Sequence, residues 1–359
     1  MTGLEAVLRT GVDAGLTSGA VAAISVDGRV RERAAVGLAN VVDQQPMTVD
    51  TLFDIASLTK VVGTTTALMV LTGRGEIDPD DPLRKFISSP DPAITLRHLL
   101  THRSGLLPWQ PLYFGAQNLT DTVDLIRSLP LAAPVGSVRS YSDLGVILLG
   151  AVIETVTGTD LATAVRDLVT SPLGLSHIGY RPPGTSPSTG TVAATSPGDL
   201  IEQRMVATGE PYPVILDGAD FIRWRSHVLA GEVADCNAFH ALGGVAAHAG
   251  LFATADDLLA VANGLLGVGD FPAPRAVVER FLRPGPNDQA LGWWTKELPA
   301  GIGIWHSGFT GTRLLLQPAT SRAVVLLTNR LHVLVGRPSA TPADVAPVWA
   351  EVQAVAGLM

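Results

Sequence analysis

Strand signals stand at both ends of this chain, and helix signals fill its middle. Near the start, apolar runs flank the Asp27-Gly28 pair, a dipeptide that favours the two-residue turn of a β-hairpin. Near the end, "GIWHSG", "TRLLLQP" and "RAVVLLTN" follow one another as consecutive strands. The most economical assembly joins both ends in one antiparallel sheet, with helices on it and a helical region beside it. We expect a ligand site in the cleft between those two regions.

Apolar periodicity predicts the helices. The first segment, "MTGLEAVLRTGVDAG", places Leu4, Val7, Leu8 and Val12 on one face of a short amphipathic helix. Further helices are predicted from about Ser57 to Gly73 or Gly75, in "LRHLLTHRSGL", from the caps Ser142 or Asp143 to Gly158, after the cap Thr254, and over about Pro342 to Ala356. The stretch from Arg181 to Ala219 is rich in Pro, Gly, Ser and Thr, and we interpret it as an excursion or lid outside the core.

These elements predict a mixed α/β (α+β) fold in two parts. Residues 1–75 and 290–359 form a discontinuous sheet domain, and residues 76–289 form a mainly helical domain that includes the excursion near 181–219. The length of 359 residues allows one large domain or two medium ones.

Composition excludes several classes of protein. With 47% hydrophobic and 16% charged residues the chain is globular, and its net charge of -8 without a basic patch argues against a nucleic-acid partner. Cys236 is the only cysteine, so neither an intrachain disulfide nor a cluster of thiolate metal ligands is possible. We see no signal peptide and no run of roughly 18 apolar residues. We therefore expect a cytoplasmic protein without a membrane partner, and the sequence leaves its oligomeric state undetermined.

Lysine is scarce in this chain, which draws attention to "SLTK". Of the three lysines, Lys60, Lys85 and Lys296, the first follows Ser57 by three residues where an apolar helix begins. Residues at i and i+3 share a helix face, so the amine can reach the hydroxyl. A serine becomes a nucleophile when a base takes its proton, and desolvation can supply a neutral lysine. The alternative is a solvated lysine on a helix surface.

Two further groups carry possible chemistry. Tyr141 and Asp143 stand at the start of an apolar helix, where a tyrosine could relay a proton and an acid could orient it. The alternative is a helix cap with a core aromatic. His306, Ser307 and Gly308 end a predicted strand, and the glycine would let a substrate approach the backbone closely. The alternative is an ordinary strand end and turn.

In chain order, Ser-x-x-Lys at 57–60, Tyr-x-Asp at 141–143 and His-Ser-Gly at 306–308 resemble the motifs of the serine β-lactamase and penicillin-binding protein superfamily. The chain resembles the class C-like branch, which includes esterases and D-amino-acid peptidases. Stretches such as "LLTHRSGL", "LGGVAAHAGLFATADDL" and "WHSGFTGT" support the resemblance, which covers roughly residues 20–331. It implies a mixed sheet domain flanked by helices, an all-helical domain and a cofactor-free acyl-enzyme mechanism.

The resemblance also implies roles for individual residues. Ser57 would be the acylated nucleophile, and Lys60 and Tyr141 would share general-base and general-acid duty, with the first proton acceptor left open. The backbone N–H groups of Ser57 and Phe309 would form the oxyanion hole. His306 would replace the lysine of the family's Lys-Thr-Gly triplet. The predicted substrate-binding residues are Asp143, His306, Ser307 and Gly308, together with Trp109, which follows the Ser104-Gly105 turn in an aromatic loop and either forms a wall of the acyl pocket or covers the core of the helical domain.

Two departures from the family pattern affect the expected substrate. Asp143 stands where β-lactamases and peptidases have asparagine, so it cannot donate a hydrogen bond to a substrate carbonyl, and it favours a charged Lys60. His306 is mostly neutral at pH 7 and attracts a carboxylate less than a lysine would. Both changes argue against efficient penicillin hydrolysis and fit an ester or a small amide better.

We therefore predict a serine hydrolase that acts on a small ester or a peptide-like substrate, with esterase ahead of D-peptidase and β-lactamase third. The alternatives are a weak or inactive relative that binds a peptide-like or acyl ligand, and an acyltransferase. His98 and His102 have a spacing used by zinc sites, but without a third ligand a structural role is favoured. For His240 and His248 packing is favoured over a place in the site. We expect no metal and no cofactor.

Overall fold

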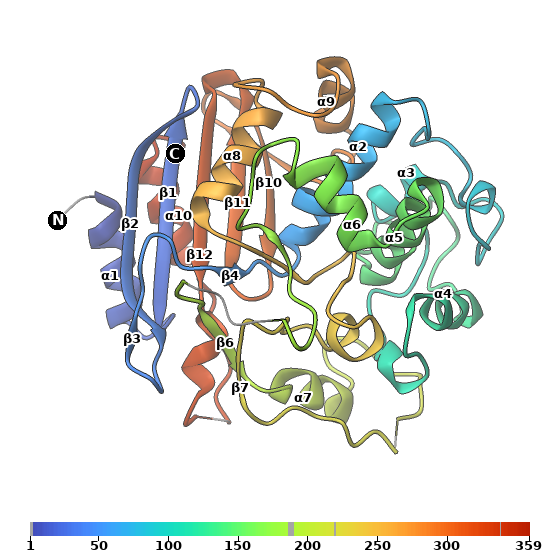
Figure 1. The fold of residues 1–359 in the computed structure, drawn as a ribbon, viewed down its shortest axis with the longest axis horizontal. Coiled ribbons are helices and arrows are strands. Elements are labelled where there is room, and N and C mark those ends of the chain that lie inside the picture. Colours follow the sequence, from blue (N-terminus) through green and yellow to red (C-terminus); the bar gives the residue numbers. More distant parts are fainter. Residues whose placement is uncertain (1–2, 186–189, 219, 338) are drawn as a thin grey trace.

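A seven-stranded antiparallel sheet forms one side of the molecule in this computed structural model, which describes residues 3–185, 190–218, 220–337 and 339–359 (Figure 1). Its strand order is β3-β2-β1-β12-β11-β10-β9. The strands are β1 (Gly19–Val26), β2 (Arg29–Asn40), β3 (Gln45–Pro46), β9 (Trp294–Leu298), β10 (Gly301–Gly308), β11 (Thr312–Gln317) and β12 (Arg322–Thr328). Because β1 pairs with β12 from Ala20↔Thr328 to Val26↔Arg322, the sheet is made from both ends of the chain, as predicted.

The turn between β1 and β2 has the geometry that its sequence predicts. Asp27 and Gly28 have φ values of 50° and 74°, the left-handed conformation that both central residues of a type I′ turn require. The edge strand β9 was not predicted, because its "WTKEL" lacks a continuous apolar pattern and its side chains are mostly half-buried. It pairs with β10 from Trp305↔Trp294 to Gly301↔Leu298.

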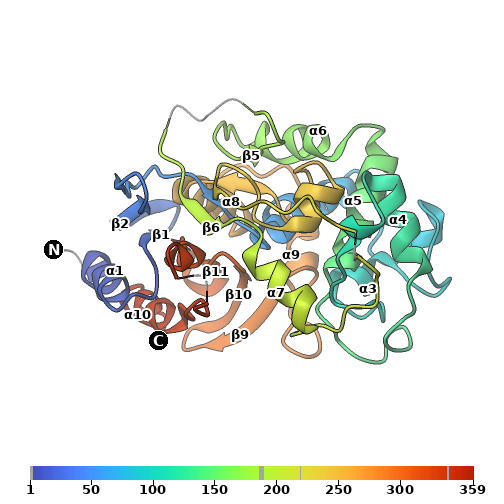
Figure 2. The ribbon, with the colours of Figure 1, turned by 90° about the horizontal axis from the view of Figure 1, so that it is seen from below.

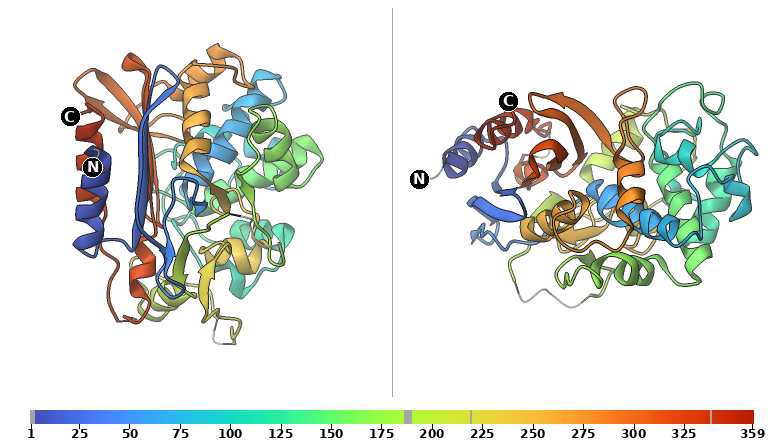
Figure 3. Two further views of the ribbon diagram at one scale, coloured as in Figure 1. Left: turned by 60° about the vertical axis from the view of Figure 1, so that its left-hand side comes forward. Right: turned by 90° about the horizontal axis from the view of Figure 1, so that it is seen from above.

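Helices cover both faces of the sheet. On one face, α1 (Gly3–Asp13) and α10 (Ala346–Val355) pack on side chains such as Ala22 and Leu326 (Figure 3, left). The next residues along the same strands, such as Ala23 and Leu327, face the opposite side and join the main core. There α8 (Ala255–Leu265) lies on β1 and β12, and its predicted cap is present: the Thr254 hydroxyl accepts from the Asp257 amide. The division into domains at residues 75 and 290 stays a prediction.

The helical region packs beside the sheet. It contains α2 (Thr66–Gly73), α3 (Leu96–Leu100), α4 (Leu119–Ser128), α5 (Asp143–Thr157), α6 (Leu161–Val165) and α9 (Arg275–Leu282) (Figure 1). Helix α5 is apolar all round and buried from Leu144 to Ile153, which makes it a core helix. The Ser142 hydroxyl accepts from the Gly145 amide at its start. Among the described residues no single helix is long and apolar enough to cross a membrane, and only the bent pair Asp143–Thr157 with Leu161–Thr170 reaches that length and composition together.

Two small sheets connect the regions. The first has the order β4-β8-β5, with β4 (Phe53–Asp54), β8 (Leu251–Ala253) and β5 (Gly179–Tyr180). The second pairs β6 (Ala194–Pro197) with β7 (Val228–Ala230). Strand β4 matters most for function, because the "SLTK" segment begins three residues after it.

The excursion that was predicted to lack core elements contains more structure than expected. It holds β6, whose Ala194 is fully buried, and helix α7 (Leu200–Thr208). No residue of α7 is fully buried. A helix that buries no face needs no apolar stripe, so its sequence carries no periodic signal by which a helix could have been predicted. Helix α7 lies at the lower end of the molecule in Figure 1, and in the view from below it stands in front, between the sheet on the left and the helical region on the right (Figure 2).

Candidate active site

A strained turn presents Ser57. Strand β4 ends at Asp54, and two residues later Ala56 has φ 46°, a left-handed conformation that is unfavourable for a residue with a Cβ. The buried carboxylate of Asp54 stabilises this turn, because its Oδ1 accepts from the Ala56 amide at 2.8 Å. Burial raises the pKa of Asp54 from 3.8 to about 6. This hydrogen bond holds the backbone of the turn, and with it the position of the Ser57 side chain.

The hairpin between β10 and β11 holds the other side of the turn. The hydroxyl of Thr312 donates to the carbonyl of Ile55 at 3.0 Å. A Cβ at Gly308 would lie 2.6 Å from that same carbonyl oxygen and 2.2 Å from Thr312 Oγ1, so only glycine fits there. This contact brings the amide of Phe309 beside the turn. Within the described part of the chain neither this amide nor that of Ser57 has a hydrogen-bond acceptor, as an oxyanion hole requires.

Lys60 lies directly behind Ser57. Its Nζ donates to Ser57 Oγ at 2.7 Å and to the carbonyl oxygen of His248 at 2.9 Å, and it pairs with Asp143 Oδ1 at 2.8 Å. The side chain is only 3% exposed, which excludes the solvated-lysine alternative. Lys60 begins a π-helical turn, η1 (Lys60–Thr65), that leads into α2. Such turns are frequent at functional sites.

The environment of Lys60 keeps it charged. Burial lowers its pKa, but the charge of Asp143 and the neighbouring Tyr141 outweigh that effect and raise the pKa above its ordinary value. Nζ donates hydrogen bonds to Ser57 Oγ and to the carbonyl oxygen of His248, and the carboxylate of Asp143 lies beside it as an ion-pair partner, surroundings that suit an ammonium. In the resting site Lys60 is therefore a donor to Ser57, which is the consequence expected of an aspartate at position 143.

Tyr141 lies over the same ammonium, with Lys60 Nζ 5.1 Å from the centre of its ring. Burial raises the pKa of the phenol, and the charge of Lys60 only partly opposes this, so Tyr141 is a neutral proton donor at pH 7. Its ring packs against His102 at 4.5 Å, Trp294 at 5.8 Å and His306 at 6.1 Å between centres. This aromatic wall fixes the hydroxyl on the side of Ser57.

The two histidines of this wall are neutral. Burial and the charge of Lys60 lower the pKa of His306 to about 3, and the same causes lower that of His102 well below its ordinary value. His306 Nδ1 lies 2.9 Å from the carbonyl oxygen of Ser307 and donates to it. Its Nε2 is buried and has no partner among the described residues. His306 therefore supplies no positive charge to a substrate. His102 accepts from the Ser142 amide at 3.2 Å, so its role includes positioning this wall.

His248 has a closer connection to the site than the sequence indicated. While its carbonyl oxygen accepts from Lys60, its ring Nε2 pairs with Asp235 Oδ1 at 3.0 Å. Asp235 Oδ1 also accepts from the Ala238 amide at 2.7 Å. The pair Asp235–His248 therefore fixes one of the two hydrogen-bond acceptors of Lys60. No short-range sequence signal relates these residues.

Two pockets meet at Ser57, and they share Ser57, Tyr141, Phe309 and Arg330. The larger has a volume of about 640 Å³ and the smaller about 340 Å³. The structure brings all the sequence-predicted site residues together: Asp143 and Trp109 line the larger pocket, His306, Ser307 and Gly308 line the smaller one, and Lys60 lies behind Ser57.

Several lining residues were missed by the sequence reasoning. The larger pocket is walled by the unpredicted helix α7 and the segment after it, with Glu202, Arg204, Met205 and Tyr212. Their segment lacks periodicity, which removed the signal that could have found them. Arg330 was missed because it follows a strand that gave no chemical motif of its own.

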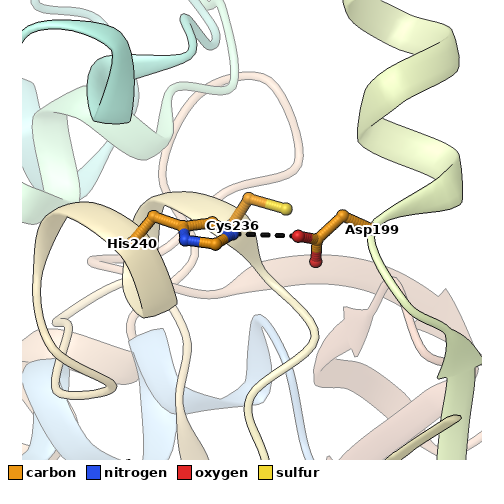
Figure 4. A group of neighbouring side chains, drawn as sticks. All are labelled: Asp199, Cys236 and His240. Atoms are coloured by element: carbon orange, nitrogen blue, oxygen red, sulfur yellow. Dashed lines mark hydrogen bonds and ion pairs between the residues drawn. The ribbon is translucent and has the colours of Figure 1, made fainter. Parts of the chain in front are cut away.

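A buried polar cluster supports the wall of the larger pocket. Asp199, Cys236 and His240 place their ligand-type atoms within 4.8 Å of one another (Figure 4). His240 Nε2 lies 2.9 Å from Asp199 Oδ2, and Arg225 binds Asp199 Oδ1 through Nε at 2.8 Å. Because Arg225 already neutralises the carboxylate and burial raises the pKa of the Cys236 thiol, the cluster fits an ion-pair clamp better than a metal centre. His240 therefore holds Asp199 in the wall of the larger pocket.

Comparisons with known proteins agree with this geometry. Residues 4–346 match the Beta-lactamase family. The chain belongs to that family. The family resemblance, the mixed fold and the serine hydrolase class are thereby confirmed for this member of the Beta-lactamase family.

Relatives of this family member carry several names. It is 31% identical over 360 residues to a protein of Escherichia coli K12 named "Putative D-alanyl-D-alanine carboxypeptidase", covering 88% of this chain and 79% of that one. It is 29% identical over 365 residues to "N-acetylmuramyl-L-alanine amidase" of Bacillus subtilis 168, covering 90% and 80%. Among solved structures, the hydrolase EstCE1 has a TM-score of 0.74 at 22% identity, covering 99% and 97%, a likeness of fold.

Proposed function

We propose that the protein hydrolyses small esters through an acyl-enzyme on Ser57. The observation that carries the proposal is the contact of 2.7 Å between Lys60 Nζ and Ser57 Oγ, at a turn where the amides of Ser57 and Phe309 are free to bind an oxyanion. One cleft then contains the nucleophile Ser57, its proton-transfer partner Lys60 and the two oxyanion donors. Tyr141 lies in the same cleft as a second proton donor.

The proton of Ser57 needs an acceptor while its Oγ bonds to the substrate carbonyl carbon. Lys60 can accept it only after it has lost one of its own protons, either to solvent or to Asp143, whose Oδ1 lies 2.8 Å away. Tyr141 is the second candidate, although its raised pKa makes the phenolate scarce at pH 7. When the C–O bond of the ester breaks, Tyr141 or Lys60 returns a proton to the leaving oxygen. Water then repeats the sequence and releases the acid.

This proton arrangement favours esters over amides. A charged Lys60 is a weak base, and an ester carbonyl with an alkoxide leaving group makes a smaller demand on general acid and base catalysis than an amide does. Asp143 offers no N–H to the amide carbonyl of a peptide or a penicillin. We therefore place D-peptidase activity second and β-lactamase activity third. EstCE1 is described as a hydrolase with promiscuous acyltransferase activity, which supports testing acyl transfer to alcohols as a further outcome.

The test compares wild type and Ser57→Ala with p-nitrophenyl acetate and butyrate. We expect the variant to lose ester hydrolysis while its thermal unfolding stays close to wild type. Intact-protein mass spectrometry of wild type with a slow ester should show one added acyl group, and peptide mapping should place it on Ser57. Equal turnover by both proteins would refute the proposal. Ester binding without turnover or mass gain would instead identify a ligand-binding relative.

A further inference from the structure

The larger pocket beside Ser57 is rich in carboxyl groups. Six of the described residues that line it are acidic: Asp54, Asp143, Asp199, Glu202, Glu210 and Asp235. The two arginines of the lining, Arg204 and Arg330, donate to backbone carbonyls. The pocket of about 640 Å³ therefore has acidic walls and opens onto the nucleophile.

Four of these carboxyl groups have partners within the protein. Asp54 accepts from two backbone amides, at 2.8 and 2.7 Å. The other three form ion pairs of 3.0 Å or less: Asp143 with Lys60, Asp199 with Arg225 and Asp235 with His248. These four groups are already bound and offer little free charge to a ligand.

Glu202 differs from them because it has no cation. Its Oε1 accepts from the Cys236 amide at 2.7 Å. Its Oε2 is buried and has no hydrogen-bond partner within the described ranges of the chain, and no cationic side chain there pairs with it. Burial, and next the charge of Asp235, raise the pKa of Glu202 well above its ordinary value. A carboxyl group in such surroundings is stabilised as a carboxylate when a ligand brings a positive charge.

Tyr113 does not supply what Glu202 lacks. The charge of Glu202 is among the causes that raise the pKa of this buried phenol, and the Tyr113 hydroxyl has no partner at hydrogen-bond distance among the described residues. A neutral phenol brings no positive charge to a carboxylate. The larger pocket therefore keeps one buried acid whose counter-charge is not part of the described chain.

We propose that the larger pocket binds a primary ammonium group of the ester substrate, and that Glu202 is the residue that determines this specificity. The inference rests on the proposed function, because the same pocket includes Ser57, so a cation bound there belongs to the molecule whose carbonyl reacts. An ammonium donates short, charge-assisted hydrogen bonds to a carboxylate, and their strength grows in a pocket that is shielded from water. The substrate class is then an ester that carries an amino group.

The test uses pairs of esters in which a methyl group replaces the ammonium. Two pairs place it on the acyl side: alanine methyl ester, in both enantiomers, with methyl isobutyrate, and methyl 6-aminohexanoate with methyl heptanoate. The third places it on the leaving side: 6-aminohexyl acetate with heptyl acetate. The released acid is measured by mass spectrometry. Wild type should prefer the ammonium ester in at least one pair, as the ratio of the two kcat/KM values.

Variants of Glu202 test the residue itself. Glu202→Gln should reduce the ratio about tenfold, because the amide keeps the shape and loses the charge, and Glu202→Asp should reduce it by less. A merely structural role would slow both esters of a pair alike and leave the ratio unchanged. Glu351→Gln, at an exposed position in α10, is the matched control and should keep the ratio. A preference that survives Glu202→Gln would refute the role given to this residue.

Binding separates this inference from the proposed function. In the Ser57→Ala background, calorimetry should show tighter binding of the preferred ammonium ester than of its neutral partner, and Glu202→Gln should remove the difference. If wild type hydrolyses no ester but this difference is found, the function fails and the ammonium site stands. If esters are hydrolysed but both members of each pair react and bind equally, the ammonium site is refuted and the function stands.

Discussion

Replacing Asp143 by asparagine should convert Lys60 into a better base. The two charged atoms lie 2.8 Å apart, which corresponds to about 6 kcal/mol of attraction at an effective dielectric constant of about 20. Asp143 is 20% exposed, and solvent screening reduces the attraction to on the order of 3 kcal/mol. Since one pKa unit corresponds to about 1.4 kcal/mol, Asp143→Asn should lower the pKa of Lys60 by about two units.

The assay is the pH profile of kcat/KM for an activated ester. We expect its ascending limb to move to lower pH by about two units in Asp143→Asn, because neutral Lys60 becomes available earlier. Asp81→Asn is the matched control: it removes the partner of Lys85, an ion pair of the same 2.8 Å length on the surface, and should leave the profile unchanged. A limb that stays in place in Asp143→Asn would refute the role given to this pair.

Three further predictions follow from the geometry. Gly308→Ala should reduce kcat about a hundredfold by displacing the Ser57 turn, whereas Gly179→Ala, with open space around its Cβ, should have little effect; equal kinetics in both variants would contradict the packing argument. Asp235→Asn should loosen His248, lower kcat about tenfold and shift the pH profile, and a fall in stability with an unchanged profile would limit Asp235 to a structural role. The pKa of Asp54 is raised in the folded state from 3.8 to about 6. Its contribution to the free energy of unfolding is therefore present below pH 4 and is lost as pH rises through 6, by up to about 3 kcal/mol. Urea unfolding between pH 4 and 7 should show this fall in the free energy of unfolding in wild type, and Asp54→Asn should lack it.

Local signals were enough to predict most of the sheet and the reactive centre. The Asp27-Gly28 turn, the cap at Thr254 and the helix from Ser142 to Gly158 are each encoded by neighbouring residues, and the structure has them at the predicted places. The contact between Ser57 and Lys60 follows from helical spacing alone. These features could be predicted from the sequence because each is determined by a few neighbouring residues.

Other parts of the site depend on contacts between distant segments. The carbonyl of His248 reaches Lys60 across 188 positions in the sequence, and no motif marks a backbone oxygen. Helix α7 contributes Glu202 and Met205 to the larger pocket, yet its low amphipathicity hid it. The protonation state of Lys60 was predictable in direction from Asp143, but its degree of burial was not.

The pairing of β1 with β12 also has a consequence for how this protein is made. The centre of the sheet cannot form until Thr328, the partner of Ala20, has been synthesised. The turn that carries Ser57 likewise lacks its hydrogen bond from Thr312 until this C-terminal part of the chain has been made. At roughly 5–20 residues per second on the ribosome, the time between the synthesis of Ala20 and that of Thr328 is on the order of 15–60 seconds. During that time one edge of β1 lacks its neighbour and is open to pairing with other chains. The synthesis of the last strands therefore both completes the turn that carries Ser57 and covers the exposed edge of β1.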